Sequence, residues 1–403
     1  MTNNIVTTQA VMETTPQLLR NAIDSRITKV RPMATPIDQI SRLAGSHQAG
    51  SMEVAYYRVD SKPFTSETTD EITMSAAEYN SDTGKVVKAK VKDITPFAAS
   101  DTVLLPAYFA DSAKSKALTA YVVAVAQGTD SSGELTLAFP VNYKGNIASG
   151  STIVRMGRAA TELDVQTAQY VNIPTREQNY CQIFKMQVEQ SILTRLSDKE
   201  VAWTFSEQEE AAVIDMRLGM EKNFLFGSKC KLYDTQKGEY VYMTNGIWNQ
   251  AGKSHNIDIE SASVDDFIDL AHNVFTGNNG SRKRLLIGGG KFVSAVSKMP
   301  FNDKVLFGAT HSKWGLETRE IATNFGSLYL LHSEVFDQCG HEYDAMVVDQ
   351  AFISKFCHIP FRPEKLNLRA SGTRNSDAVV LTEASCMVLR NPMTHCRIFG
   401  KPS

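Results

Sequence analysis

The chain has 403 residues, of which 42% are hydrophobic and 21% are charged, and its formal net charge is -2. This composition is typical of a folded globular protein and disfavours a wholly disordered chain, while the length predicts two or more domains. The near-neutral charge disfavours a protein that binds nucleic acid by neutralising phosphates.

The sequence has no run of about 18 apolar residues, so no membrane-spanning helix is expected. The first residues, MTNNIVTTQAVMETTPQ, lack the basic start and apolar centre of a signal peptide. The six cysteines are scattered over the chain without the spacing of a disulfide framework. We therefore expect reduced thiols in a cytoplasmic product.

Residues 1–50 read as a polar leader with too few apolar side chains to fold alone. A short helical pattern near residues 14–23 is followed by Pro32 and Pro36, which favour an extended backbone. A second short helix is expected at 37–43. The pattern predicts an arm that must lie on another surface.

Residues 51–158 favour β structure. Strands are expected at 52–59, 85–94, 119–126, 134–139 and 151–157. The third and fourth of these flank the turn-rich stretch GTDSSG and predict a hairpin. Together they indicate a compact β excursion from the main body.

The lysines of this excursion, Lys85, Lys88, Lys90 and Lys92, admit three interpretations. They could form a nucleic-acid patch, although no aromatic residues are interleaved with them. They could be the solvated face of an edge strand, on which lysine discourages aberrant pairing. They could also be a basic face that meets an acidic neighbour in an assembly.

The next segment turns helical. Residues 179–196 fit either a helix or a strand followed by a helix. Ser206 followed by Glu209 matches a capping box, apolar residues then recur at helical spacing, and Gly227 is a natural C-cap. A helix of about 20 residues spans roughly 30 Å, and its apolar residues cover more than one stripe, so we expect a central strut that packs on both sides.

Residues 240–375 favour a mixed α/β domain. Helices are expected at 265–275 and 292–299, and strands at 284–287, 317–322, 327–332 and 345–348. A last strand is expected at 378–389, with a turn at Asn391 and Pro392 leading into 395–399.

The stretch LLIGGGKF, residues 285–292, places three glycines and a lysine between a strand and a helix, as phosphate-binding loops do. Phe292 occupies the place of the hydroxyl residue that a P-loop needs, and Val293 that of the third glycine of a dinucleotide fingerprint. We interpret the stretch as a tight strand-to-helix turn.

Three Cys/His clusters lie near the end of the chain: Cys339 with His341, Cys357 with His358, and His395 with Cys396. Their spacing is not that of paired zinc ligands, so buried cysteines and surface histidines are the expected reading. No nucleophile motif is present, and the acidic cluster at residues 207–210 suits a helix start. No catalytic residue, metal site or cofactor is predicted.

Two short sequence motifs of this chain are similar to motifs in one branch of a known family. The stretch REQNYCQIF at 176–184 is followed by a helical segment that ends in GMEKNFLFG. The matching positions are Asn179, Gln182, Ile183, Phe184, Gly219, Glu221, Leu225 and Gly227. With these motifs, the chain resembles the Hong Kong 97-type major capsid proteins of tailed bacteriophages. It also resembles them in its order of arm, β excursion, strut helix, α/β domain and returning strand.

The resemblance implies an α+β Hong Kong 97-type capsid fold with a small inserted β module. Its parts would be an N-terminal arm at 1–50, an E-loop at 51–94 and the inserted β module at 95–158. The remaining parts would be a peripheral domain at 159–245 with its spine helix at 207–226, an axial domain at 246–375, and strands at 376–403 that return to the peripheral domain.

The resemblance also implies a function without catalysis: hexamers and pentamers in an icosahedral head that encloses double-stranded DNA without sequence-specific binding. Expected partners are a portal, a scaffolding protein and decoration proteins, with no membrane, in a virion assembled in the bacterial cytoplasm. The candidate inter-subunit contacts are Lys85, Lys88, Lys90, Lys92, Tyr56, Tyr57, Arg20 and Arg31.

Two alternatives remain. An encapsulin-like compartment shell would share the fold, and gene context or cargo would distinguish it from a phage head. A nucleotide-binding enzyme would use the loop from Gly288 to Gly290.

Overall fold

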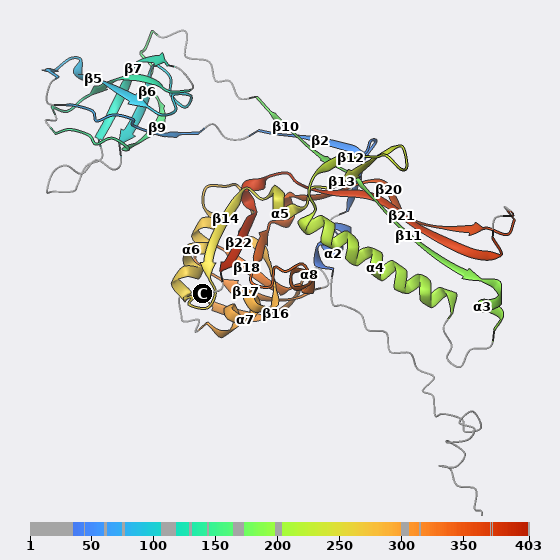
Figure 1. Cartoon of the computed structure of the whole chain (residues 1–403). Coiled ribbons are helices and arrows are strands. Elements are labelled where there is room, and N and C mark those ends of the chain that lie inside the picture. Colours follow the sequence, from blue (N-terminus) through green and yellow to red (C-terminus); the bar gives the residue numbers. More distant parts are fainter. Residues whose placement is uncertain are drawn as a thin grey trace, which may run out of the picture. The chain divides into compact units, whose positions relative to one another are not determined.

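The chain forms two compact units, residues Met1–Tyr56 together with Arg176–Ser403, and residues Tyr57–Thr175 (Figure 1). The computed structural model describes residues 35–43, 45–59, 63–74, 77–105, 118–128, 131–142, 145–163, 173–197, 204–299, 306–313, 316–370, 372 and 374–401. The expected helical pattern at 14–23 lies outside these residues. Helix α2 (Pro36–Leu43) confirms the second expected helix of the arm.

The smaller unit is built on a seven-stranded sheet in the order β3-β9-β6-β7-β8-β5-β4. Its strands are β3 (Thr65–Glu67), β4 (Tyr79–Asn80), β5 (Gly84–Val91), β6 (Asp101–Leu105), β7 (Leu118–Gln127), β8 (Gly133–Phe139) and β9 (Thr152–Arg158). The predicted hairpin is confirmed, because β7 and β8 pair antiparallel. Alternate side chains such as Leu135, Leu137 and Phe139 are fully buried in its core.

The expected boundary between an E-loop and an inserted module at residues 94/95 is wrong as a division between folding units. Strand β5 pairs along its length with β8, and β3 pairs with β9. Both halves therefore contribute strands to one sheet and side chains to one core. The alternation that predicted each strand could not show which strands pair, because pairing partners are far apart in sequence.

The larger unit contains a four-stranded sheet in the order β1-β20-β21-β11. Its strands are β1 (Ser46–Gln48), β11 (Gln182–Ser191), β20 (Ile353–Asn367) and β21 (Ser376–Leu389). Strands β11 and β21 pair antiparallel from Gln182 opposite Ser385 to Ser191 opposite Ser376. Residues 179–196 are thus a strand followed by the short helix α3 (Ile192–Leu196), the second of the two expected readings.

Helix α4 (Phe205–Phe226) is the predicted strut, and it lies along the β11–β21 side of this sheet (Figure 1). Its capping box is formed by Thr204 and Glu207, so the predicted box of Ser206 and Glu209 is wrong by two residues. The Thr204 side chain accepts from the Glu207 N–H, and the Glu207 carboxylate accepts from the Thr204 N–H. Gly227 is the C-cap, as predicted, and a Cβ there would lie 2.5 Å from the Asn223 carbonyl oxygen.

A second seven-stranded sheet, of mixed direction, has the order β14-β22-β19-β15-β18-β17-β16. Its strands are β14 (Lys253–Asp258), β15 (Lys283–Gly288), β16 (Leu306–Lys313), β17 (Leu316–Ala322), β18 (Ser327–His332), β19 (Ala345–Val348) and β22 (Cys396–Lys401). Helices α6 (Val264–Phe275), α7 (Gly290–Lys298) and α8 (Glu334–Gln338) accompany it. The helices and strands predicted for the axial domain are therefore confirmed.

Two of the expected domain boundaries do not hold. Strand β20 lies within the expected axial range, yet it pairs with β21 in the four-stranded sheet. Strand β22 lies within the expected returning segment, yet it pairs with β14 and β19 in the axial sheet. Only β21 of that segment returns to β11 as expected.

The remaining elements are short. Strand β2 (Glu53–Arg58) pairs with β10 (Thr175–Tyr180), and β12 (Cys230–Asp234) pairs with β13 (Glu239–Met243). Helix α5 (Ile247–Gln250) and two 3₁₀ turns, η2 (Gln350–Phe352) and η3 (Pro392–Thr394), complete the described elements. The α+β class is confirmed, and the element order expected of a Hong Kong 97-type chain is present.

Candidate functional site

The arm is held on the strut helix by a backbone-to-carboxylate contact. The N–H groups of Ile37 and Asp38 donate to the two carboxylate oxygens of Glu221 at 2.9 and 2.8 Å. These are N–H groups of the first turn of α2, which have no partner within the helix. Glu221 thus caps α2 from another element, and both Ile37 and Glu221 are fully buried.

Four further charged side chains surround this contact. Arg217 of α4 lies 2.9 Å from Glu383 and 3.4 Å from Asp38. Lys355 of β20 lies 2.8 Å from Glu383 and 3.5 Å from Asp38. We call Asp38, Arg217, Glu221, Lys355 and Glu383 the arm clamp.

The arm clamp joins α2, α4, β20 and β21 in one network. Its two cations face three acidic side chains, and every member except Arg217 is almost fully buried. Arg217 also lies over the Phe361 ring, with 4.7 Å from its guanidinium carbon to the ring centroid. Removing one partner of such a network leaves a buried charge uncompensated, so the clamp fixes the position of the arm helix.

The pKa of Glu221 is raised to about 8, chiefly by burial and in smaller part by the nearby Asp38 carboxylate, against the opposing effect of the two N–H donors and Lys355. No residue of the arm clamp was predicted to be functional from its sequence pattern. The available signal was an acidic residue within the largely apolar stretch GMEKNFLFG.

A second feature is the hairpin of β12 and β13, which exposes apolar side chains on both faces. Leu232 lies opposite Val241, and Tyr233 lies opposite Tyr240. These four side chains are 53%, 43%, 54% and 58% exposed, respectively. The two tyrosine rings contact edge to face at 5.1 Å, and Lys231 lies over Tyr240 and Tyr242.

Three of the four lysines singled out in the sequence lie on one exposed face of β5 and its C-terminal end. Lys88, Lys90 and Lys92 are exposed, and each has an acidic partner within its own unit: Glu134 at 2.7 Å, Asp70 at 3.0 Å and Glu67 at 2.6 Å. Lys85 does not belong to this face, since it points to the other side of the strand and is 3% exposed. The strict alternation of β structure requires this.

Of the three interpretations of this row, the edge strand is contradicted by the sheet order, which places β5 between β8 and β4. Strand β4 pairs with the start of β5, and the Thr69 N–H donates to the Lys90 carbonyl oxygen at 2.9 Å. The Lys92 N–H donates to the Glu67 carbonyl oxygen at 2.9 Å. Other segments of the same unit therefore cover both ends of β5.

The other predicted contact residues differ in accessibility. Tyr57 is 68% exposed, whereas Tyr56 is half-buried against the small core around Val54. Arg20 and Arg31 lie outside the described residues. The contacts predicted for all eight residues stay predictions.

The glycine loop forms the predicted turn between β15 and α7, and its donors are occupied. The Gly290 N–H donates to the Asp337 carboxylate at 2.7 Å, and the N–H groups of Lys291 and Phe292 donate to the Glu342 carbonyl oxygen. The Lys291 ammonium lies 2.6 Å from the Glu342 carboxylate. A phosphate would have to displace the Asp337 carboxylate from the Gly290 N–H and would be repelled by its negative charge. The geometry therefore disfavours the nucleotide-binding alternative.

The cysteines and histidines of the three clusters do not come together in the fold, and the histidines contact different partners. His341 pairs with Asp344 at 2.7 Å and stacks on Phe226 with 4.4 Å between ring centroids. His395 is fully buried, contrary to the expected surface position, and burial lowers its pKa to about 3. Among the described residues, no group of three His, Cys, Asp or Glu side chains is placed to hold a metal ion.

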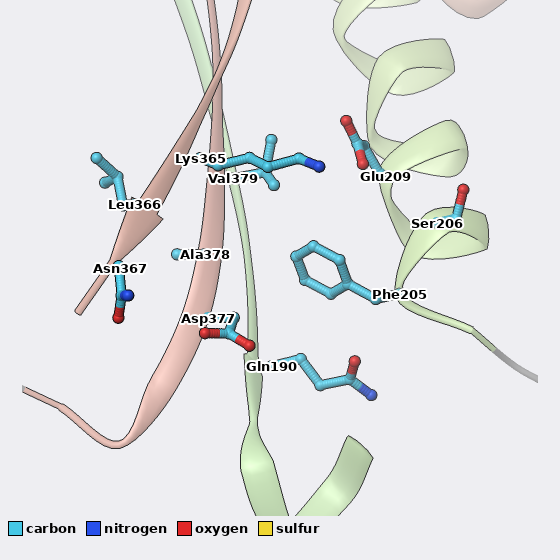
Figure 2. Close-up of a pocket in the computed structure, with 10 residues that line it drawn as sticks. All are labelled: Gln190, Phe205, Ser206, Glu209, Lys365, Leu366, Asn367, Asp377, Ala378 and Val379. Carbon is cyan, nitrogen blue, oxygen red and sulfur yellow. The ribbon is translucent and has the colours of Figure 1, made fainter. Parts of the chain in front are cut away.

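A groove of about 410 Å³ opens between the start of α4 and the ends of β11, β20 and β21 (Figure 2). Its lining residues are Gln190, Phe205, Ser206, Glu209, Lys365, Leu366, Asn367, Asp377, Ala378 and Val379. The sequence predicted none of them as a site residue, although Ser206 and Glu209 were expected to cap the helix.

No described helix is long and apolar enough to cross a membrane. A strut helix, a clamped arm and an exposed apolar hairpin define an α+β protein organised around contact surfaces. The chain belongs to the SU10 major capsid protein family, whose family model matches residues 2–402. The match confirms the predicted major capsid protein.

Solved structures similar to this chain include the capsid of a native GTA particle, with 9% sequence identity, 97% of this chain and 99% of that chain covered, and a TM-score of 0.49. Mycobacterium phage Bobi gives 10% identity, 99% and 100% coverage and a TM-score of 0.47. The holo-SrpI encapsulin complex from Synechococcus elongatus PCC 7942 gives 10% identity, 57% and 77% coverage and a TM-score of 0.38. A comparison with curated proteins finds no match to this chain.

Proposed function

We propose that this chain assembles into hexamers and pentamers that form the icosahedral head of a tailed bacteriophage and enclose its double-stranded DNA. The observation that carries the proposal is the family match over residues 2–402, since it includes the arm and the smaller unit as well as the central domains. In this proposal the protein acts by self-association and has no catalytic role.

The hairpin of β12 and β13 supports subunit contacts. A two-stranded hairpin is at best marginally stable alone, and this one leaves apolar side chains exposed on both faces. Exposed apolar clusters on folded proteins mark interaction sites. Burial of these faces against neighbouring copies would stabilise both the hairpin and the shell.

The proposed relation to DNA is enclosure without sequence-specific binding. The chain has a net charge of -2, and the exposed lysines of β5 already face acidic partners. A surface of this kind would not bind phosphates strongly. Portal, scaffolding and decoration proteins are further proposed partners, in a virion assembled in the bacterial cytoplasm.

Electron cryo-microscopy of the protein expressed alone, and with its scaffolding partner if it has one, tests the proposal. The expected result is closed shells containing rings of five and six subunits. A soluble monomer under both conditions at high concentration would overturn it. The contents of particles from the native source then distinguish two roles: nuclease-protected DNA supports a phage head, and a packaged protein cargo supports an encapsulin-like compartment.

A further inference from the structure

The groove at the start of α4 contains a buried side-chain amide that has no hydrogen-bond partner in the described part of the chain. The side chain of Gln190 is on β11 and is 6% exposed. Among the described residues, neither its amide nitrogen nor its amide oxygen has a hydrogen-bond partner. Leaving a buried donor and acceptor unpaired costs about 1–3 kcal/mol for each group, so native proteins rarely tolerate this arrangement unless another molecule or segment completes it.

The surroundings of Gln190 fit a peptide. The Phe205 ring and the Val379 side chain supply apolar surface beside the amide (Figure 2). A primary amide has one donor side and one acceptor side, which together match the carbonyl and N–H groups of an extended backbone. The groove can therefore bind a segment that contributes both a peptide group and small apolar side chains.

The groove continues the same seam that α2 fills. The arm clamp lies between α4 and the β20–β21 strands, at Arg217 and Glu383, and the groove lies between the same elements, at Glu209 and Val379. Eight residues of helix separate Arg217 from Glu209, or about 12 Å. Four residues of strand separate Glu383 from Val379, or about 13 Å. About four extended residues would span that distance.

The chain upstream of α2 has the length and composition for this groove. Residues 1–34, which lie outside the described part of the chain, lead directly into α2. They contain isolated apolar pairs, Ile5–Val6, Val11–Met12 and Leu18–Leu19, among threonines, asparagines and glutamines. Four basic and two acidic side chains give them a basic balance, whereas Glu209 and Asp377 outnumber Lys365 in the groove.

We propose that a part of residues 1–34 binds in the α4–β21 groove of its own chain, with Gln190 hydrogen-bonded to its backbone. The arm then follows one continuous seam, first as an extended segment in the groove and then as the clamped helix α2. This assignment goes beyond the proposed shell function and does not depend on it.

A photo-crosslinking amino acid in place of Lys365, whose side chain points toward the groove (Figure 2), tests the proposal in the full-length protein. Unlabelled chains are mixed with chains labelled with a heavy nitrogen isotope before irradiation and mass spectrometry. The expected product joins position 365 to a peptide from residues 1–34 of the same isotopic label. Mixed-label products would assign the groove to a second copy, and products from any other segment, or none, would equally overturn the proposal.

The substitution Gln190→Leu separates binding from a structural role. We expect the crosslink yield to fall about 25-fold, since two hydrogen bonds are lost and each contributes a net factor of roughly five. Thermal stability should not fall, because Gln190 has no partner within the described fold. The matched control Gln187→Leu changes an exposed glutamine of the same strand and should leave the yield unchanged. Equal yields for the two variants would refute the assigned role of Gln190.

Discussion

The backbone N–H of Ile37 donates to the Glu221 carboxylate at 2.9 Å, across 184 positions of sequence. Glu221 belongs to the strut helix, and Ile37 lies in the first turn of the arm helix, so a single side chain fixes where the arm enters the central core. The neighbouring N–H of Asp38 donates to the other oxygen of the same carboxylate at 2.8 Å. The first turn of α2 is thereby satisfied by α4.

Substitution of Glu221 by alanine should release the arm helix. Two buried N–H groups would lose their acceptor, and we expect the free energy of unfolding to fall by about 2 kcal/mol or more. Chemical denaturation measures the loss, and limited proteolysis near residues 35–43 locates it. Asp215→Ala, an exposed acid on the same helix, is the control and should change stability by less than about 0.5 kcal/mol. Equal effects of the two variants would contradict the clamp.

The pH dependence of stability should carry the signature of Glu221. Its pKa in the folded chain is raised to about 8 from 4.5, so the folded state holds this proton more tightly than the unfolded state. Its contribution to stability is therefore complete below pH 4.5 and is lost as the pH rises through 8. Burial and the Asp38 carboxylate oppose ionisation of Glu221, whereas the N–H groups of Ile37 and Asp38 and the Lys355 ammonium favour it.

Glu221→Gln removes this proton while keeping the shape of the side chain. Relative to this variant, the unmodified protein should lose stability between pH 5 and pH 8 with a slope of at most about 1.4 kcal/mol per pH unit. Denaturant titrations across that range measure the slope. Parallel curves for the two proteins would show that Glu221 does not titrate in this window.

His395 should cause a separate loss of folding stability at acidic pH. Burial lowers its pKa to about 3 from 6.5, and its Nδ1 accepts from the Asp349 N–H at 3.2 Å. Because the folded state holds the neutral ring, its contribution is present above pH 6.5 and is lost as the pH falls toward 3. Compared with His395→Gln, the unmodified protein should destabilise more steeply between pH 6 and pH 4, and thermal melts in that range decide the point.

The sequence predicted elements better than it predicted their partners. Periodicity located α4, β5, β15 and β21, because burial of one face imposes a regular spacing on each element. It could not assign β20 to the sheet of β21, or join β5 to β8, because pairing depends on distant residues. The arm clamp escaped prediction for the same reason, since Asp38 and Lys355 become partners only in the folded chain.

Lys355 and Lys88 give a direct comparison of buried and exposed ion pairs. Lys355 is 3% exposed between Asp38 and Glu383, so Lys355→Met should destabilise the fold by about 3–5 kcal/mol. Lys88 is paired with Glu134 on an open surface, so Lys88→Met should change stability by less than about 1 kcal/mol. Denaturation midpoints test both values. Similar losses would indicate that burial does not set the strength of these pairs.

Assembly should depend on the apolar faces of the β12–β13 hairpin. The double variant Leu232→Lys and Val241→Glu places charges on one face, and Tyr233→Ser with Tyr240→Ser removes the rings from the other. All four side chains are exposed within the chain, so the monomer should fold with nearly unchanged thermal stability. Buried in a shell contact, the two opposed charges would lose their hydration and replace an apolar contact, and the lost rings would remove apolar area. Sedimentation velocity should show at least one double variant as unassembled subunits under conditions where the unmodified chain forms shells, and normal shells from both would exclude the hairpin as a contact.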